Sequence, residues 1–374
     1  DVTLYYGTQA DFVSSWYGDG SATEYTIRTA EELAYFAQLV NGTATDSTGN
    51  IVAAQTFSGK VITLARDIDL SAVCHPADEE SGIAEASWTP IGTSRNKFAG
   101  TFDGNGYTIG NMSVTVANNS GQAGLFGGLS GTVQNLIVTG EIKLEGCETP
   151  LFVGSIAGQA MKSTITKCNS RVNITVQNFS KAASVGGLAG VGNGTVKNCL
   201  NEGRILVESR QAVGNTIIGG IASGGCAVNA CWNTGEITVE VPRATGKINV
   251  GGMIGQNGNN VLVNCYNGGA IKVMSNADSN MECLVGGIAG KAGNKGVHNS
   301  YNLGDVMCTK AGTAYGISSA AVTNSYYIYK INSDDTVDMK YINKAEQDIT
   351  YEEAAHTYKV GEDTLVKTLN ENRG

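Results

Sequence analysis

One motif returns about every 32 residues along this chain and constrains its fold more than any other feature. Its copies begin at Asn198 (NCLNEGRI), Asn229 (NACWNTGEI), Asn264 (NCYNGGAI) and Asn299 (NSYNLGDV). One column of the aligned copies holds Leu136, Cys168, Cys199, Cys231, Cys265, Ser300 and Ser325. The column three residues earlier is aliphatic throughout: Val133, Ile165, Val196, Val228, Leu262, Val297 and Val322. So regular a repeat predicts a solenoid, in which each copy adds one coil to a continuous core.

The repeat also predicts where the chain turns. The position before the cysteine column is Asn in five of seven copies, at Asn135, Asn198, Asn264, Asn299 and Asn324, and it is Lys167 or Ala230 in the other two. Asn tolerates the left-handed conformation of a tight corner, and stacked Asn side chains can hydrogen-bond from coil to coil. A Gly-x-aliphatic triplet and a later VGGLAG-like segment supply the other turns, in a chain with 50 Gly. Three strands and three corners per copy predict an all-β fold, a right-handed, three-sided parallel β-helix with coils of about 32 residues.

The two ends of the chain depart from the repeat and are predicted to cover the open ends of the solenoid. Near the N-terminus, Thr29 and Glu32 form a capping-box pattern before apolar residues at helical spacing, and Asn41-Gly42 ends the predicted helix. Thr350 and Glu353 indicate a second capped helix. We therefore expect an N-terminal cap over residues 1–60, β-helix repeats over 61–328 and a small C-terminal capping segment over 329–374.

Charge and composition limit the classes of molecule that the chain is expected to bind. The formal net charge of −9 comes from scattered acids, which argues against nucleic acid. No apolar run is long enough to cross a bilayer, so no membrane insertion is expected in this segment, and a monomer is expected. The nine Cys form no CxxC pattern, and no metal or cofactor is predicted. We expect the four Cys of the repeat column to be buried free thiols.

An aromatic column follows the cysteine column and is the sharpest candidate for a site. It comprises Leu200, Trp232, Tyr266, Tyr301 and Tyr326. Strand alternation places these side chains on the outer face, where aromatic rings can stack on sugar rings or on the apolar surface of a partner. Stacking between coils that merely shields the backbone explains the same pattern. The four aromatic residues are the predicted ligand-binding residues.

Enzymatic alternatives have weaker support in the sequence. Asp67, Asp69 and Asp103 could supply the paired carboxylates of glycoside hydrolysis, although isolated acids more often form turns or lie in solvent. The three His belong to no HExxH motif, and no nucleophile elbow is present. No catalytic residue is therefore assigned, and the chain is not expected to be an enzyme.

The GGLAG and GGIAG segments resemble the GLUG repeat of large exported bacterial surface proteins, some of them associated with immunoglobulin-cleaving peptidases. The stretches EYTIRTAEELAYFAQLVNG and FAGTFDGNGYTI resemble the N-terminal portion common in such proteins, so the resemblance covers most of residues 24 to 327. It implies a secreted or cell-surface location. The functional expectation is a non-catalytic adhesion or ligand-binding module for a host or environmental glycan or protein surface. A structural spacer, or a polysaccharide hydrolase or lyase on a β-helix, is the alternative.

Overall fold

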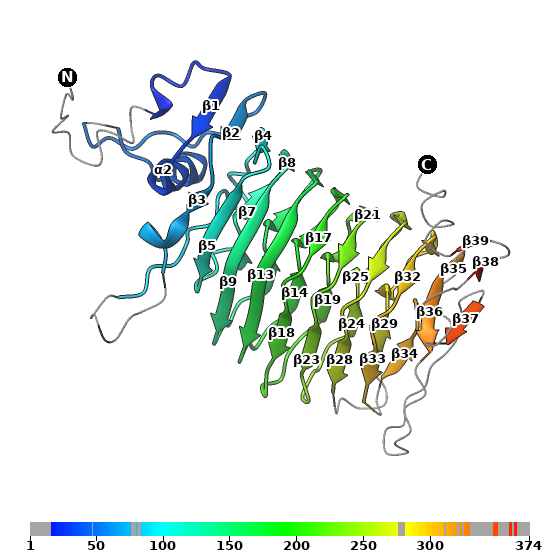
Figure 1. Ribbon diagram of the computed structural model, residues 1–374. Coiled ribbons are helices and arrows are strands. Elements are labelled where there is room, and N and C mark those ends of the chain that lie inside the picture. The colour runs from blue at the N-terminus through cyan, green and yellow to red at the C-terminus, as the bar shows by residue number, and fades with distance from the viewer. Residues whose placement is uncertain are drawn as a thin grey trace.

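The computed structural model describes residues 16–46, 48–75, 80, 84–275, 281–309, 312–319, 322–323, 325–329, 347–350, 359–360 and 363–364. These residues form an all-β parallel solenoid of about six turns, with one α-helix near the N-terminus. Figure 1 shows the coils stacked side by side into an elongated body, with the helix at one end. The predicted parallel β-helix class is confirmed.

Four parallel sheets run along the described part of the solenoid. The ten-stranded sheet contains β1 (Glu24–Ile27), β2 (Val61–Leu64), β4 (Thr101–Asp103), β8 (Thr132–Gln134), β12 (Thr164–Thr166), β16 (Thr195–Lys197), β21 (Ala227–Asn229), β26 (Leu262–Val263), β31 (Val297–His298) and β35 (Val322–Thr323). The fourteen-stranded sheet contains β3 (Ile68–Asp69), β5 (Thr108–Val114), β9 (Ile137–Glu145), β13 (Asn169–Gln177), β17 (Leu200–Asn201), β18 (Ile205–Glu208), β22 (Trp232–Asn233), β23 (Ile237–Glu240), β27 (Tyr266–Asn267), β28 (Ile271–Met274), β32 (Tyr301–Asn302), β33 (Val306–Cys308), β36 (Tyr326–Tyr329) and β37 (Gln347–Thr350).

The Gly-rich segment of each copy supplies the other two sheets. The seven-stranded sheet contains β6 (Gln122–Ala123), β10 (Leu151–Gly154), β14 (Ala183–Gly186), β19 (Thr216–Gly219), β24 (Ile248–Gly251), β29 (Cys283–Gly286) and β34 (Thr313–Tyr315). The six-stranded sheet contains β7 (Phe126–Leu129), β11 (Ala157–Ala160), β15 (Ala189–Gly192), β20 (Ala222–Gly224), β25 (Ile254–Gln256) and β30 (Ala289–Lys291). The short strands β38 (Lys359–Val360) and β39 (Asp363–Thr364) pair with each other.

The expectation of three strands per copy needs correction, because the Gly-rich segment bends into two short strands and the strand of the fourteen-stranded sheet is also interrupted in the later copies, as between β22 and β23. In the copy that contains Ile221, β19 ends at Gly219 and β20 begins at Ala222, with Ile221 fully buried at the bend. A Cβ on Gly219 would overlap the carbonyl oxygen of Ala222, so only Gly fits this sharp turn. The sequence reveals the inward aliphatic position but not the bend beside it.

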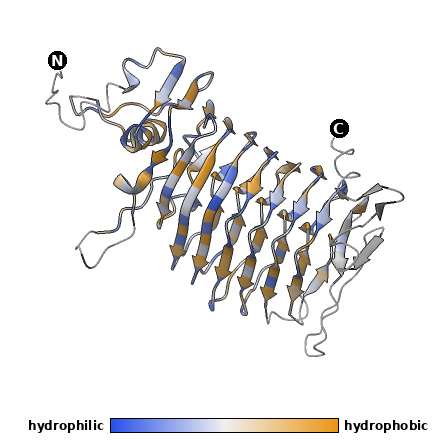
Figure 2. Ribbon diagram, viewed as in Figure 1, coloured by the Kyte–Doolittle hydropathy of each residue, from blue (hydrophilic) through white to orange (hydrophobic). Residues whose placement is uncertain are grey.

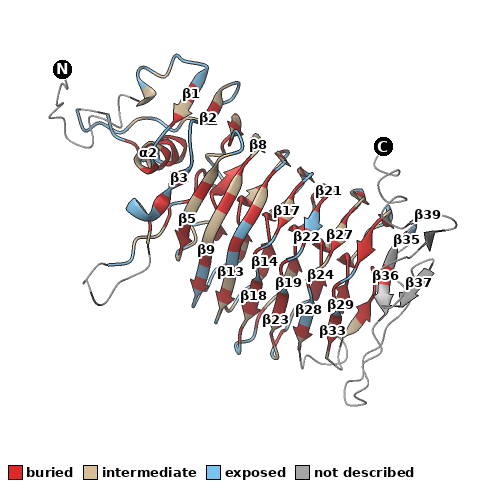
Figure 3. Ribbon diagram, viewed as in Figure 1, coloured by how far each residue is buried: buried red, intermediate tan, exposed pale blue. Residues whose placement is uncertain are grey.

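The predicted inward columns form the core. The aliphatic column from Val133 to Val322 is 0–8% exposed, and the cysteine column from Leu136 to Ser325 is 0–2% exposed. Hydrophobic and polar residues alternate along the strands in Figure 2, and buried and exposed positions alternate in the same way in Figure 3. The parallel register keeps equivalent residues of successive copies directly opposite one another, as for Val133, Ile165 and Val196.

The N-terminal helix is confirmed and lies at the first coils. Helix α2 (Ala30–Asn41) begins after Thr29, whose Oγ1 accepts a 3.2 Å hydrogen bond from the Glu32 N–H, and ends at Gly42 with a φ of 74°. The Phe36 ring packs 5.0 Å from Phe57, centroid to centroid. A short 3-10 turn, η1 (Leu70–Ala72), follows β3. Within the described ranges, no helix is both long and apolar enough to cross a membrane.

The predicted second helix falls mainly outside the described residues. Thr350, its expected N-cap, is the last residue of strand β37, which pairs in parallel with β36. The division of the chain at residues 60 and 328 stays a prediction.

Candidate functional site

One corner of the solenoid is built by a column of left-handed residues. The φ angle is 52° at Asn135, 53° at Lys167, 54° at Asn198, 49° at Ala230, 56° at Asn264 and 46° at Asn299. The predicted corner is therefore confirmed for every copy in which the structure describes this position, and Asn324 lies outside the described residues. Lys167 and Ala230 adopt the conformation although it costs non-Gly residues energy, because the flanking strands are fixed by the ladder.

The expected hydrogen bonds between coils belong to a different Asn column. Asn201 donates to Asn233, Asn233 to Asn267 and Asn267 to Asn302, each bond running from Nδ2 to Oδ1 over 2.7–2.8 Å. These four side chains are 0–1% exposed. The corner residue Asn135 instead donates from its Nδ2 to the Asp103 carboxylate, at 3.0 Å. The repeated NCLN pattern contains the signal for this ladder, in its second Asn.

The cysteine column lies directly inside the corner. Its thiols donate to the backbone carbonyl oxygen two residues earlier, at 3.4 Å for Cys168, 3.1 Å for Cys199 and 3.2 Å for Cys231 and Cys265. All nine Cys are free, and all except the half-buried Cys147 are buried. Burial raises the pKa of Cys265 to about 12 and that of Cys226 to about 11. The four thiols of the column are therefore buried and free, as predicted.

The predicted aromatic column is in register but unevenly exposed. Trp232 lies opposite Tyr266, Tyr266 opposite Tyr301, and Tyr301 opposite Tyr326 in successive coils. Trp232 is 42% exposed and lies on β22, whereas Tyr266 is half-buried. Tyr301 is only 7% exposed, and its ring stacks on Tyr266 at 6.0 Å and 29°, so this member of the predicted outer column is covered by its neighbours. The side chain of Tyr326 lies outside the described set.

A groove beside this column gathers the open end of the aromatic stripe and the corner residues. It has a volume of about 370 Å³. Its walls come from Gly106, Asn135, Leu136, Ile137, Lys167, Cys168, Asn169, Asn198, Cys199, Leu200 and Trp232. Ile137, Asn169, Leu200 and Trp232 occupy one position in four successive coils, so the groove runs along the stack. Four coils about 4.8 Å apart give it a length of about 14 Å.

The groove combines an apolar floor with polar groups at its edge. Lys167 and Asn198 are exposed at the corner, and neither side chain forms a hydrogen bond or ion pair with another described residue. The Nδ2 of Asn169 donates to the Glu202 carboxylate at 2.8 Å, but its Oδ1 is buried without a partner in the described part of the chain. Arg171 also donates to Glu202, at 2.6 Å, and lowers the pKa of that carboxyl. The exposed ammonium of Lys167 and the exposed amide of Asn198 are thus the polar groups that a ligand in the groove can reach.

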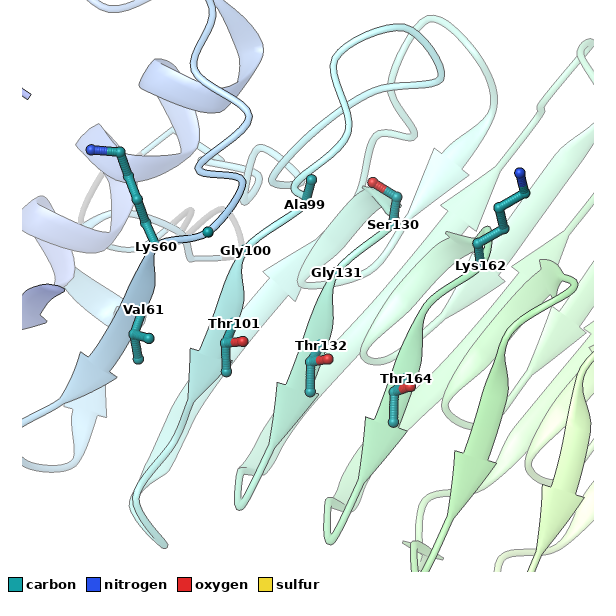
Figure 4. Close-up of a pocket in the computed structure, with 11 residues that line it drawn as sticks. Lys60, Val61, Ala99, Gly100, Thr101, Ser130, Gly131, Thr132, Lys162 and Thr164 are labelled. Atoms are coloured by element: carbon teal, nitrogen blue, oxygen red, sulfur yellow. The ribbon is translucent and has the colours of Figure 1, made fainter. Parts of the chain in front are cut away.

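A second hollow, of about 350 Å³, lies on the ten-stranded sheet near the N-terminal end. Figure 4 shows Thr101, Thr132 and Thr164 side by side on successive strands, with Lys60 and Lys162 at its ends. The Lys60 ammonium is engaged elsewhere, because it donates to the carbonyl oxygens of Gly20 and Ala22 at 2.6 Å. This hollow contains no aromatic side chain and is the weaker candidate.

The acids considered for glycoside hydrolysis accept hydrogen bonds from backbone and side-chain donors of neighbouring coils and turns. Asp67 accepts from the Thr108 N–H at 2.8 Å, and Asp69 accepts from the Ser71 N–H at 2.9 Å. Asp103 accepts from Gln134 and Asn135, and these bonds lower its pKa although partial burial opposes them. Backbone and side-chain hydrogen bonds likewise lower the pKa of Asp69. A general acid needs a raised pKa, so the turn-forming interpretation of Asp69 and Asp103 is favoured.

Similarity to known proteins is partial. No protein-family model matches the chain. A protein of Evansella cellulosilytica described as a proposed Gly-rich membrane protein is 38% identical over 98 residues, which are 25% of this chain and 10% of that protein. Halomucin of Haloquadratum walsbyi is 35% identical over 109 residues, 28% of this chain and 1% of halomucin. A solved structure described as a proposed immunoglobulin A1 protease from Bacteroides ovatus aligns over 88% of this chain and 85% of that chain, with a TM-score of 0.46 and 18% identity.

Proposed function

We propose that this chain is a non-catalytic, extracellular ligand-binding module whose corner groove takes a glycan. The half-exposed indole of Trp232 at the end of the groove is the observation that carries this proposal. An indole face binds the apolar C–H face of a sugar ring well, and an aromatic ring beside a polar edge is typical of binding surfaces. Tyr266 and Tyr301 of the same column contribute mainly by supporting the surface, because their rings stack on each other.

The polar edge of the groove fits the other side of a sugar. Hydroxyl groups can accept from the ammonium of Lys167 or the amide nitrogen of Asn198, and can donate to the amide oxygen of Asn198. The groove length of about 14 Å suits a short segment of an oligosaccharide rather than a single small molecule. A protein partner would present a flatter and larger surface than this groove covers.

The extracellular part of the proposal draws on the relatives. One of them is described as a proposed membrane protein, and the matched segments cover 10% and 1% of the two relatives. A bacterial cell-surface or secreted location is consistent with that description and with the sequence resemblance to exported surface proteins. Cell fractionation and surface labelling of the cells that naturally produce this protein test its location independently of any ligand.

The binding proposal is tested on a glycan array that carries host and bacterial polysaccharides. The chain is compared with Trp232→Ala and with a matched control, Leu303→Ala, which removes another exposed apolar side chain from a later coil. We expect binding to at least one glycan, loss of about tenfold or more in Trp232→Ala, and no change in Leu303→Ala. Equal binding by all three proteins would contradict the groove, and release of reducing ends or unsaturated sugars would support a hydrolase or lyase instead.

A structural spacer is the second candidate, and the elongated stack in Figure 1 favours it. A rod separates whatever is attached at its two ends without any recognition site. The spacer would be supported over the binding module by two results together. The folded chain would bind nothing on glycan and host-matrix arrays, and deletion of one whole coil would weaken the function of a longer protein that contains the chain.

A further inference from the structure

Two cysteines near the C-terminal end of the solenoid meet outside the cysteine column. Cys283 is the first residue of β29, and Cys308 is the last residue of β33, in the following coil. Their sulfur atoms are 3.8 Å apart, and the side chains are 4% and 6% exposed. The chain between them forms most of one coil, so a covalent bond here would join two parts of the stack that the backbone connects only by a long path.

The surroundings of this pair differ from those of the column thiols. Each column thiol donates to a backbone carbonyl two residues earlier, as Cys231 does to Asn229 at 3.2 Å, and this bond holds the sulfur in place. Within the described residues, the polar partner of Cys283 is the sulfur of Cys308, and the reverse holds as well. A modest rotation about each Cα–Cβ bond would therefore break no other hydrogen bond.

Gly312 leaves the space in which the two sulfurs meet. A Cβ at this position would overlap the Cys308 sulfur and would come within 2.9 Å of the Cys283 sulfur. Gly312 itself thus packs directly against both thiols. This site is compact enough for the Sγ–Sγ separation of about 2 Å that a disulfide requires.

We propose that Cys283 and Cys308 form a disulfide when the chain meets a disulfide oxidant such as oxidised glutathione. The Cys308 thiolate attacks one sulfur of the oxidant, which forms a mixed disulfide and releases one thiolate. The Cys283 thiolate then attacks the Cys308 sulfur and releases the second thiolate. The two protein thiols lose two protons and two electrons in total, and the oxidant becomes two thiol molecules.

The order of these steps follows from the hydrogen bond between the thiols. Either thiol can donate in the contact between the two sulfurs, and this contact lowers the pKa of Cys308 although burial opposes it. The same bond and burial raise the pKa of Cys283. Cys308 is therefore the thiol that ionises first and begins the exchange.

The disulfide would cross-link and stabilise the C-terminal coils of the solenoid. The end of a solenoid has a neighbour on one side only, so its coils open more readily than those in the middle. A bond between β29 and β33 prevents two adjacent coils from separating at this corner. Oxidation would thus protect the C-terminal coils, and a reducing environment would release them.

The full chain is incubated with oxidised glutathione in two arms, one in the folded state and one during refolding from denaturant. The refolding arm is needed because burial of the two thiols can slow their reaction in the folded state. Remaining thiols are alkylated and the digest is analysed by mass spectrometry. We expect a peptide pair linked through Cys283 and Cys308 and a fall in free thiols from nine to seven. The oxidised chain should unfold about 5 °C higher than the reduced chain.

Cys283→Ser and Cys308→Ser should each abolish the link and the thermal shift, whereas Cys147→Ser should keep both. Alkylation of Cys283 and Cys308 to the same extent as the column thiols, in both arms, would overturn the proposal. A thermal shift that persists in Cys308→Ser would assign the effect to other thiols and would overturn it as well.

Discussion

Asn233 Nδ2 donates a 2.8 Å hydrogen bond to Asn267 Oδ1 in the next coil and a 3.0 Å bond to the carbonyl oxygen of Gly235 in its own coil. Both protons of this buried amide are thereby used. Equivalent pairs join Asn201 to Gly203, Asn267 to Gly269 and Asn302 to Gly304. The ladder ends at Asn201, whose Oδ1 lacks a described partner, because Ser170 occupies the equivalent position one coil earlier.

Replacement of Asn233 by Ala should destabilise the chain by about 2–3 kcal/mol. The change removes the acceptor for Asn201 and the donor for Asn267, and an unsatisfied buried polar group costs more than a lost surface hydrogen bond. Asn229→Ala, at an exposed position of the same copy, should change stability by less than about 0.5 kcal/mol. Urea unfolding followed by circular dichroism measures both values. Equal losses in the two variants would show that the ladder adds nothing to stability.

Gly220→Ala should be at least as damaging, at about 3 kcal/mol or more. A Cβ on Gly220 would overlap the side chain of Asn233 and the carbonyl oxygen of Gly252, and a packed core cannot move both. Gly258→Ala is the matched control, because a Cβ there meets nothing within 4 Å. The control should be neutral or slightly stabilising, since Ala restricts the unfolded chain. Thermal unfolding of the two variants in parallel provides the comparison.

Removal of the Tyr301 ring should cost stability, whereas removal of Trp232 should cost binding. Tyr301 is 7% exposed and stacks on Tyr266, so Tyr301→Ala should lose about 3 kcal/mol. Trp232 is 42% exposed, and Trp232→Ala should lose less than about 1 kcal/mol. Denaturant midpoints distinguish the two roles. A large stability loss in Trp232→Ala would mean that this side chain is structural. A loss of binding in that variant could then not be attributed to the site.

The stability of the chain should fall as the pH rises above about 8.5. The pKa of Cys265 is about 12 in the folded state because the thiol is buried, whereas an unfolded Cys ionises near 8.5. Above the unfolded pKa the unfolded chain loses a proton that the folded chain keeps, so each such thiol costs about 1.4 kcal/mol per pH unit until its folded pKa is reached. Unfolding in urea at pH 7, 9 and 10 measures this slope.

Cys265→Ser should reduce that slope by the contribution of one thiol while the fold is retained. Ser already occupies the same column at Ser300, where its Oγ donates to the His298 carbonyl oxygen at 2.8 Å. An unchanged slope would show that Cys265 does not carry the pH dependence.

The sequence predicts the fold well because a repeat imposes the same packing constraint many times. The aliphatic, cysteine and corner columns all lie where the period places them, since each inward side chain must face its copy in the next coil. The coverage of Tyr301 does not follow from alternation, because alternation gives the direction of a side chain and not what its neighbours cover. Asn201 and its equivalents were missed for a related reason: two Asn per copy fit a ladder, and only the packing against the Gly-rich segment distinguishes them.

The candidate groove was only half visible in the sequence. Trp232 and Leu200 belong to the predicted column, but the groove also needs Lys167, Asn198 and Ile137, which come from the corner and from a more N-terminal coil. Stacking of the coils places these corner and strand residues around one hollow. The repeat shows which residues are equivalent from copy to copy, but it does not show that a hollow forms between the corner and the strand.

The backbone hydrogen bonds between coils, such as Trp232 N–H to the Cys199 oxygen at 2.8 Å and Tyr266 N–H to the Cys231 oxygen at 3.0 Å, point along the stacking direction. Tension between the two ends of the stack therefore pulls on the bonds of one coil interface at a time and peels coils away in sequence. Each released coil lengthens the chain by about 100 Å. Under load the solenoid would therefore unfold coil by coil at low force. This stepwise lengthening would limit the peak tension on whatever is attached to it.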